Sequence, residues 1–452
     1  MSTPTLMAVQ PKKNLPPLTA GLLTGLLVAL LPGLLPAQVA AKYLAALGAA
    51  VLIWQRPAAG LYLFLAGLAF LPTLSAGELL LAVAAIWALR RLLAGERVLA
   101  ATGVELPLFA FIFFVLMGVA FSVTRRASLS VLPLYALDFL AFYLMAVLPR
   151  PKEAGWLLGG LLLAGALTGL LALAQYRSGV QTSLSWIDAR QAEDIKTRVF
   201  STFDNPNIFA EYLTFVLPPA LVFFLRERRW GARLVWLLVL ACAGAGLILT
   251  FSRGGWLAVG LALVVLGILW DRRLLLLVAV GLVLLPLAAP GQVLTRAASI
   301  GSLEDSSNTF RLSIWLAVLR MIAAYWSTGI GLGSAAFNQV YPQFMLAGTP
   351  AMHSHNLYLQ LALELGVPGL VAFLWLLGAV AARALSALPR LAGRRQGLLA
   401  ALLASLAGFL LHGAVDNVWY SPKLTLLFWA ALGLVLAVGR EAGGPARTAR
   451  GE

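Results

Sequence analysis

Long apolar runs separated by polar connections dominate the chain from Thr19 to Val438. Many approach the roughly 20 residues that a helix needs to cross the hydrocarbon core of a membrane. We expect fourteen spans, or twelve if the short runs 59–73 and 76–90 form one re-entrant pair. The expected spans are 18–36, 38–54, 59–73, 76–90, 105–122, 130–148, 155–175, 207–225, 233–251, 254–270, 273–289, 356–382, 397–415 and 424–439.

The composition and charge distribution agree with a polytopic helical membrane protein. Hydrophobic residues make up 61% of the chain and charged residues only 11%. The net charge of +15 could indicate nucleic-acid binding, but most basic residues fall in alternate connections, starting with Lys12 and Lys13. Basic residues favour cytoplasmic loops, so the charge reports topology and no nucleic-acid partner is expected. We predict an all-α protein with 12–14 transmembrane helices, cytoplasmic N- and C-termini and a large extracytoplasmic loop containing helices.

Two connections are too polar and long to be simple links, and the predicted topology places both outside the cytoplasm. The first covers about 176–205 and the second about 290–355. Within the second, Asn308–Tyr325 carries apolar residues at helical spacing and predicts a helix on the membrane surface or over a cavity. The single cysteine, Cys242, lies in an apolar run, so no disulfide is expected. The polar start of the chain shows no cleavage pattern, which favours an uncleaved first span.

A polar stretch at 353–356, with the sequence His-Ser-His-Asn, closes the second loop. Asn356, Gln360 and Glu364 then follow at four-residue steps, which places them along one face of a helix. Polar groups at the mouth of an apolar helix are typical of a working site rather than of packing.

His355 is the first candidate for a catalytic residue, because an imidazole can act as a general base near neutral pH. His353 is its rival or its partner, and a purely structural histidine is the alternative. A zinc site is disfavoured, since no cysteine or clear set of carboxylates completes four ligands.

Two arginines are candidates for binding an anion. Arg253 lies between two apolar runs with almost no loop, where a charge is costly unless it is functional or reaches the headgroups. Arg198 precedes a predicted helix start, where Asp204 or Asn205 could be the cap and Pro206 the first helical residue. Such a terminus favours an anion, and guanidinium groups match a diphosphate; the alternative for Arg198 is a solvated loop charge.

Other charged residues carry weaker predictions. Glu211 could orient an arginine or point into the bundle, and Arg311 is a third arginine candidate. Asp138 and Asp416 are expected to form structural salt bridges. The glycine-rich stretch 329–333 does not follow a cytoplasmic strand, which disfavours a nucleotide-binding loop.

Four motifs together resemble the O-antigen ligase and polymerase superfamily. His355-Asn356, followed after nine residues by Gly-Val-Pro-Gly at 366–369, resembles the family's His-Asn…Gly-x-x-Gly signature. The segment 198–207 is similar to the segment after the family's first large outer loop.

The other two motifs lie between these. The segment 250–256 resembles the family's boundary-arginine motif, and 311–315 resembles the start of its loop helix. The resemblance covers about 190–420 in the family's order. It departs from the family at Ser327-Thr328, where a proline often precedes the glycines.

The resemblance implies metal-independent, inverting glycosyl transfer without a cofactor, on the outer, periplasmic face of the cytoplasmic (inner) membrane. The donor would be a glycan linked to undecaprenyl diphosphate. His355 would deprotonate the acceptor hydroxyl, while Arg198 and Arg253 would hold the diphosphate. The other candidates for positioning substrate are Arg311, His353, Asn356 and Glu211.

The identity of the acceptor stays open. A ligase would use lipid A-core, a protein or another glycan, and the single dominant late loop slightly favours this function. A polymerase would use a second lipid-linked repeat unit. A small-anion transporter is the alternative from another class, because a family once assigned to bicarbonate uptake carries a similar domain. Transport is disfavoured, since the polar groups gather at one face and no internal repeat is evident.

The resemblance also divides the chain. We expect N-terminal transmembrane helices in 1–150, an O-antigen ligase-like core in 151–440 and a cytoplasmic tail in 441–452.

Overall fold

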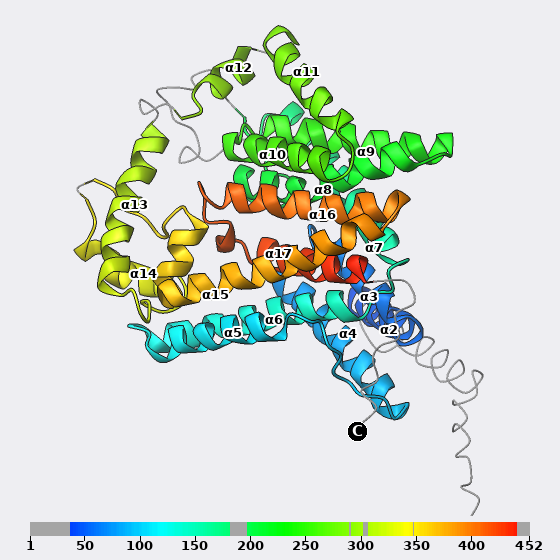
Figure 1. Ribbon diagram of the computed structural model, residues 1–452, viewed down its shortest axis with the longest axis horizontal. Helices are drawn as coiled ribbons and strands as arrows, with labels where there is room; N and C mark the ends of the chain where they lie inside the picture. The colour runs from blue at the N-terminus through cyan, green and yellow to red at the C-terminus, as the bar shows by residue number, and fades with distance from the viewer. Residues whose placement is uncertain (1–36, 181–196, 289–290, 302–305, 347, 441–452) are drawn as a thin grey trace, which may run out of the picture.

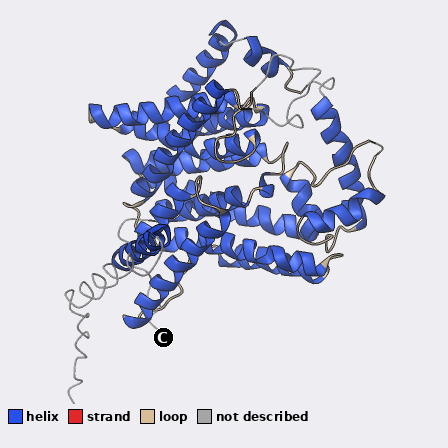
Figure 2. Ribbon diagram, turned by 180° about the vertical axis from the view of Figure 1, so that it is seen from behind, coloured by secondary structure: helices blue, strands red, loops and turns tan. Residues whose placement is uncertain are grey.

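A computed structural model describes residues 37–180, 197–288, 291–301, 306–346 and 348–440. Every regular element within these residues is a helix, and they contain no strand (Figure 2). The predicted all-α fold class is therefore confirmed. The predicted span 18–36 and the tail 441–452 lie outside the described residues.

Each predicted span from residue 38 onward corresponds to one helix. In chain order the helices are α2 (Ala37–Gln55), α3 (Pro57–Gly67), α4 (Thr73–Leu93), α5 (Glu105–Ala120), α6 (Arg125–Val147), α7 (Ala154–Ser178), α8 (Pro206–Arg226), α9 (Trp230–Leu249), α10 (Arg253–Leu269), α11 (Arg273–Ala288), α12 (Gly291–Ala298), α13 (Ser306–Ala324), α14 (Ser334–Val340), α15 (Leu357–Ala387), α16 (Gly393–His412) and α17 (Pro422–Gly439). Short 3-10 turns follow at Tyr341–Gln343, Leu388–Arg390 and Val418–Tyr420.

Seven of the described helices are long and apolar enough to cross a membrane, namely α6 to α9 and α15 to α17. Five shorter apolar helices accompany them. These lengths support a multi-pass membrane protein, while the total of 12–14 spans and the cytoplasmic position of both termini stay predictions.

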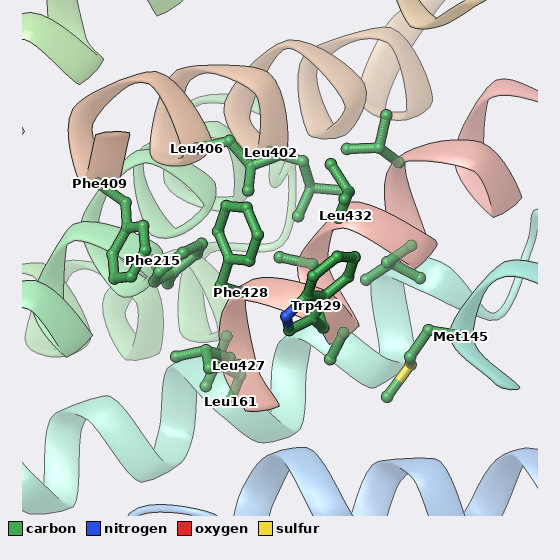
Figure 3. Packing of buried hydrophobic residues seen from close by; sticks show 14 of the residues in the cluster. Met145, Leu161, Phe215, Leu402, Leu406, Phe409, Leu427, Phe428, Trp429 and Leu432 are labelled. Atoms are coloured by element: carbon green, nitrogen blue, oxygen red, sulfur yellow. The ribbon is translucent and has the colours of Figure 1, made fainter. Parts of the chain in front are cut away.

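Helix α17 lies at the centre of the bundle, between α6 and α16. Its Phe428 and Trp429 are fully buried and stack with aromatic rings of neighbouring helices, including Phe409 at 5.3 Å from Phe428 (Figure 3). Gly433 allows α17 to approach α6 closely, because a Cβ there would lie 2.2 Å from the carbonyl oxygen of Phe142. Lipid tails are as apolar as the helix surfaces, so no hydrophobic driving force holds membrane helices together. Small residues at such contacts let helix backbones pack tightly instead.

A kink divides α15 at Gly366, whose φ is 74°. The loop at 326–333 fills the kink: the N–H of Ile330 donates to the carbonyl of Leu363 at 2.8 Å, and the N–H of Val367 donates to Trp326 at 2.7 Å. The loop thereby satisfies backbone groups that the kink removes from the helical ladder. Its glycines serve this close packing, since a Cβ at Gly329 would lie 2.4 Å from the carbonyl oxygen of Glu364.

Helices α12, α13 and α14 form a cap over one end of the bundle (Figure 1). The predicted helix at Asn308–Tyr325 is confirmed as α13. Its buried Ile314, Val318 and Met321 pack with Phe337 of α14 and Leu363 of α15. Helix α13 is therefore held by the protein itself, above the end at which α8, α10 and α15 begin.

Candidate active site

Four residues other than glycine adopt a positive φ within the described part of the chain. They are Ser201 (53°), Asp204 (57°), Phe251 (50°) and His355 (49°). All four lie in the segments that resemble family motifs, at the capped end of the bundle. A backbone conformation of this kind costs about 1–3 kcal/mol and persists only where its surroundings enforce it. The sharp turns at this end are therefore specifically built.

Asn356 fixes the position of His355. Its side chain caps α15 by accepting from the N–H groups of Tyr358 and Leu359, at 2.9 and 3.0 Å. Its amide nitrogen donates to the carbonyl of Ala414 at 2.7 Å, beyond the end of α16. One side chain thus joins the start of α15 to the connection between α16 and α17.

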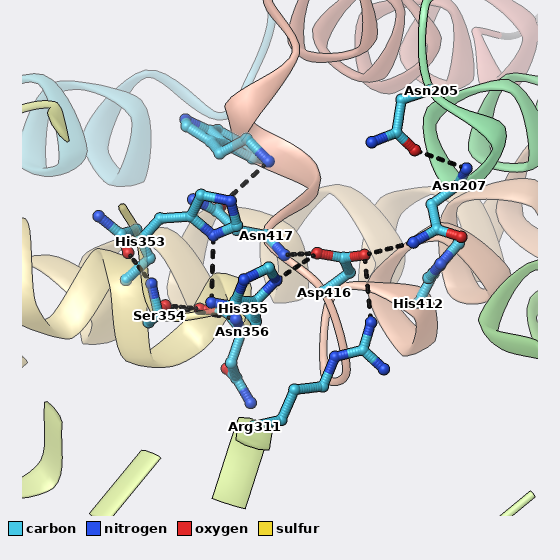
Figure 4. Close-up of polar contacts among 12 residues, drawn as sticks. Asn205, Asn207, Arg311, His353, Ser354, His355, Asn356, His412, Asp416 and Asn417 are labelled. Carbon is cyan, nitrogen blue, oxygen red and sulfur yellow. Dashed lines mark hydrogen bonds and ion pairs between the residues drawn. The ribbon is translucent and has the colours of Figure 1, made fainter. Parts of the chain in front are cut away.

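Asp416 is the centre of the polar network in this connection (Figure 4). One carboxylate oxygen lies 3.2 Å from Nδ1 of His355 and accepts from the N–H of Asn417 at 2.8 Å. The other pairs with Nη2 of Arg311 at 3.6 Å and accepts from Nδ2 of Asn207 at 3.1 Å. Burial opposes ionisation of Asp416, but the hydrogen bond to His355 and the charge of Arg311 outweigh it and lower the pKa. Asp416 is therefore an anion at neutral pH.

The hydrogen bond to Asp416 determines which nitrogen of His355 can act as a base. An ionised carboxylate only accepts, so Nδ1 carries the proton and Nε2 of the neutral ring keeps a free lone pair. The side chain of His355 is 28% exposed, which gives a substrate access to it.

His353 supports this arrangement. Its ring lies 4.1 Å from that of His355, and its Nδ1 accepts the backbone N–H of His355 at 3.2 Å. Burial, followed by the neighbouring His355, lowers the pKa of His353 to about 4, so it is neutral and can accept this bond at pH 7. The geometry thus favours His355 as the base and His353 as its support.

The two predicted anion-binding arginines converge on the same end of the bundle. Arg198 donates through Nε to the carbonyl of Thr250 at 2.8 Å and through Nη2 to Oδ1 of Asn207 at 3.1 Å. Since Asn207 also bonds Asp416, Arg198 belongs to the network of His355. Nη1 of Arg253 donates to the carbonyl and hydroxyl oxygens of Ser299, each at 2.9 Å.

Positive charge dominates around this network. Burial, and then the charges of Arg296, Arg253 and Arg311, lower the pKa of Arg198 to about 9. Arg198 still stays a cation at pH 7, and its contacts with Thr250 and, through Asn207, with Asp416 place its charge in the same region as that of Arg311. Such a field favours an anionic ligand.

The start of α8 adds to this field. Asn205, rather than Asp204, is the cap: its Oδ1 accepts the N–H of Asn207 at 2.8 Å, and Pro206 is the first helical residue. The N-terminal amides and the dipole of α8 therefore point toward the same end as Arg198.

Glu211 points into the bundle, where it lies beside a histidine. Nε2 of His412 lies 3.8 Å from Oε1 of Glu211, and both side chains are buried. Donor atoms of Glu211, His412 and Asp416 lie within 4.8 Å of one another, a set that could in kind hold a divalent ion. The ion pair of Asp416 with Arg311 and the nearby Arg198 oppose a cation here, so we assign it no metal.

The salt bridge expected of Asp416 is confirmed, since its carboxylate pairs with Arg311, and the same carboxylate also contacts His355 and Asn207. His412 and Asn207 were missed. The four-residue step from His412 to Asp416 at the end of an apolar run was the available signal. Asp138 is buried in α6, and the described residues offer it no ion pair, contrary to the salt bridge expected.

The fold and site define a multi-pass helical membrane protein with an imidazole–carboxylate pair beside clustered arginines. Residues 237–374 match the family model described as O-Antigen ligase. The chain therefore carries a domain of the O-antigen ligase family, which confirms the resemblance seen in the motifs and supports glycosyl transfer of the ligase or polymerase type. A search of curated proteins found no match. The matched segment includes Arg253, Arg311 and His355, whereas Arg198 and Asp416 lie outside it.

Proposed function

We propose that the protein transfers a glycan from undecaprenyl diphosphate to an acceptor hydroxyl, in the manner of an O-antigen ligase. The main support is the convergence of the His355–Asp416 pair with Arg198 and Arg253 at one end of the bundle. The positive-inside pattern of the sequence directs this end to the outer face of the cytoplasmic membrane. There the site can meet donors and acceptors that have left the cytoplasm.

His355 acts as the general base in this reaction. Its Nε2 takes the proton of the acceptor hydroxyl, and the acceptor oxygen forms a bond to the anomeric carbon of the donor sugar. The bond from that carbon to the diphosphate oxygen breaks, and the diphosphate leaves with the electron pair. Attack opposite the leaving group inverts the anomeric centre. Asp416 is a positioning residue that holds the base tautomer and stabilises the imidazolium.

Arg198 and Arg253 stabilise the leaving diphosphate. Negative charge grows on its bridging oxygen as the glycosidic bond breaks, and fixed guanidinium groups stabilise that charge without reorganising. Arg311 holds Asp416 and lies at the start of α13, where it can also position donor or acceptor.

Transfer fits the architecture better than transport. The polar groups gather at the capped end, while Phe215, Phe409 and Phe428 fill the centre of the bundle. A transporter would be expected to place its binding site near the middle of the membrane.

The purified protein should be incubated with a defined undecaprenyl-diphosphate oligosaccharide, with and without lipid A-core. Transfer of label to lipid A-core supports the ligase, and a ladder of longer glycans on the lipid carrier supports the polymerase. If neither product forms and sealed vesicles accumulate bicarbonate instead, the transfer function is refuted.

Arg253→Lys is expected to slow transfer by about tenfold or more, because lysine keeps the charge but loses the planar fork that matches phosphate oxygens. The measurement is the initial rate at saturating acceptor. Arg320→Lys is the matched control, because it is the same substitution at an exposed arginine of α13 in the cap. Equal rates for Arg253→Lys and the unmodified protein would show that Arg253 only contacts lipid headgroups and does not bind the diphosphate.

Gly254→Ala is expected to impair transfer by displacing His412. A Cβ at residue 254 would lie 2.6 Å from Nε2 of His412, so the ring beside Glu211 must move. Overpacking of this kind costs about 1–3 kcal/mol of stability. Gly260→Ala, also in α10, is the control, because a Cβ there meets no atom within 4 Å. Thermal unfolding and transfer rates of the two variants would be compared; identical behaviour would contradict the prediction.

A further inference from the structure

The short turn at 250–253 gathers arginines from three segments. The carbonyl of Thr250 accepts from Arg198, and the carbonyl of Phe251 accepts from Nε of Arg296 at 3.5 Å. The third arginine, Arg253, belongs to the turn itself. The positive φ of Phe251 turns the chain sharply between these two carbonyls.

Helix α12 is tied to the same turn by a second set of contacts. Arg253 donates to both oxygens of Ser299, and the hydroxyl of Ser299 donates to the carbonyl of Arg296 at 2.9 Å. The buried side chain of Val293 also anchors α12. Arg296 therefore has a defined position beside Arg253, although it comes from the cap.

We infer that Arg296 is a third guanidinium of the donor site and that it distinguishes a lipid diphosphate from a lipid monophosphate. This inference rests on the proposed function and goes beyond the pair predicted from the motifs. A diphosphate offers a second set of phosphate oxygens, which a further guanidinium fork can bind. A monophosphate lacks these oxygens and gains little from an additional arginine.

Electrostatics supports the same assignment. Arg296 and Arg198 bond the carbonyls of the adjacent residues Phe251 and Thr250, and the charge of Arg296 contributes, after burial, to the lowered pKa of Arg198. Bringing like charges together costs free energy, and an anion with several charges repays that cost.

The test measures binding of undecaprenyl diphosphate and undecaprenyl monophosphate to the full-length protein in detergent. Free pyrophosphate is a third probe, which shows whether the lipid is needed. Arg296→Ala should weaken binding of the lipid diphosphate by about tenfold or more and leave binding of the monophosphate nearly unchanged. Arg296→Lys should bind the lipid diphosphate with an affinity between those of the unmodified protein and Arg296→Ala. Arg320→Ala should match the unmodified protein.

The outcomes separate this inference from the proposed function. If the unmodified protein prefers the diphosphate and Arg296→Ala keeps that preference, Arg296 has no role in recognition while the transfer function stands. If the unmodified protein binds neither lipid, the proposed function fails as well. If Arg296→Ala weakens both lipids equally, or its thermal unfolding shows lost structure, the selective role is refuted and Arg296 only supports the fold.

Discussion

His355→Asn should abolish detectable glycan transfer while the protein stays folded and inserted in the membrane. Asparagine tolerates the positive φ of residue 355 better than most residues and can bond Asp416, but it offers no base. Loss of a general base costs about 10²–10⁴-fold in rate. The side chain is 28% exposed, so its loss removes little packing. The measurement is label transfer in purified membranes, with protein amount and thermal unfolding recorded in parallel.

A second variant separates the effect of the missing base on activity from the effect of a disturbed backbone. His355→Gly adopts a positive φ without strain and leaves a space where the imidazole was. Added imidazole should then restore part of the rate. His353→Asn is the matched control and should keep more activity, since His353 contacts the backbone of His355 rather than the acceptor. Full turnover by His355→Asn would remove this residue from the mechanism.

The fold was largely predictable because membrane helices carry their signal locally. Apolar length alone located each described span, and periodicity located α13 within two residues of its observed start. The cap of α8 was equally local, since Asn205 and Pro206 adjoin the helix they begin. Residue type was informative for His355 and Arg253 for a related reason: polar groups at the ends of apolar runs need a function or a partner.

Which residues of the site contact one another could not be predicted from local sequence. Asp416 bonds His355 across 61 positions and Asn207 across 209, and no local pattern specifies such distances. Packing of α8, α15 and α16 brings the three residues together. Arg296 illustrates the same difficulty, because one loop arginine among several became distinctive only through its contact with Phe251.

The structural role of the glycines also became clear only from the fold. The conspicuous run at 329–333 proved to fill a helix kink, with Gly331 facing Ser122 so closely that a Cβ could not fit. Gly254, in the boundary-arginine motif, lies against His412. Sequence shows that a side chain is missing at these positions, but only packing shows what occupies the space.

Asp416→Asn should lower the turnover number by about 10²-fold or more, by removing the charge that stabilises the imidazolium and fixes its tautomer. An asparagine can turn its amide toward Nδ1 of His355, which would move the proton to Nε2 and block the base. It also breaks the 3.6 Å ion pair with Arg311 and frees the start of α13.

The effect should fall on the turnover number and only weakly on the Michaelis constant for the donor, because Arg198 and Arg253 still hold the diphosphate. Asp138→Asn makes the same chemical change at a buried carboxylate in α6 and should alter stability without this loss of turnover. A raised Michaelis constant with normal turnover in Asp416→Asn would instead assign the carboxylate to substrate binding. Normal values of both would show that His355 needs no acidic partner.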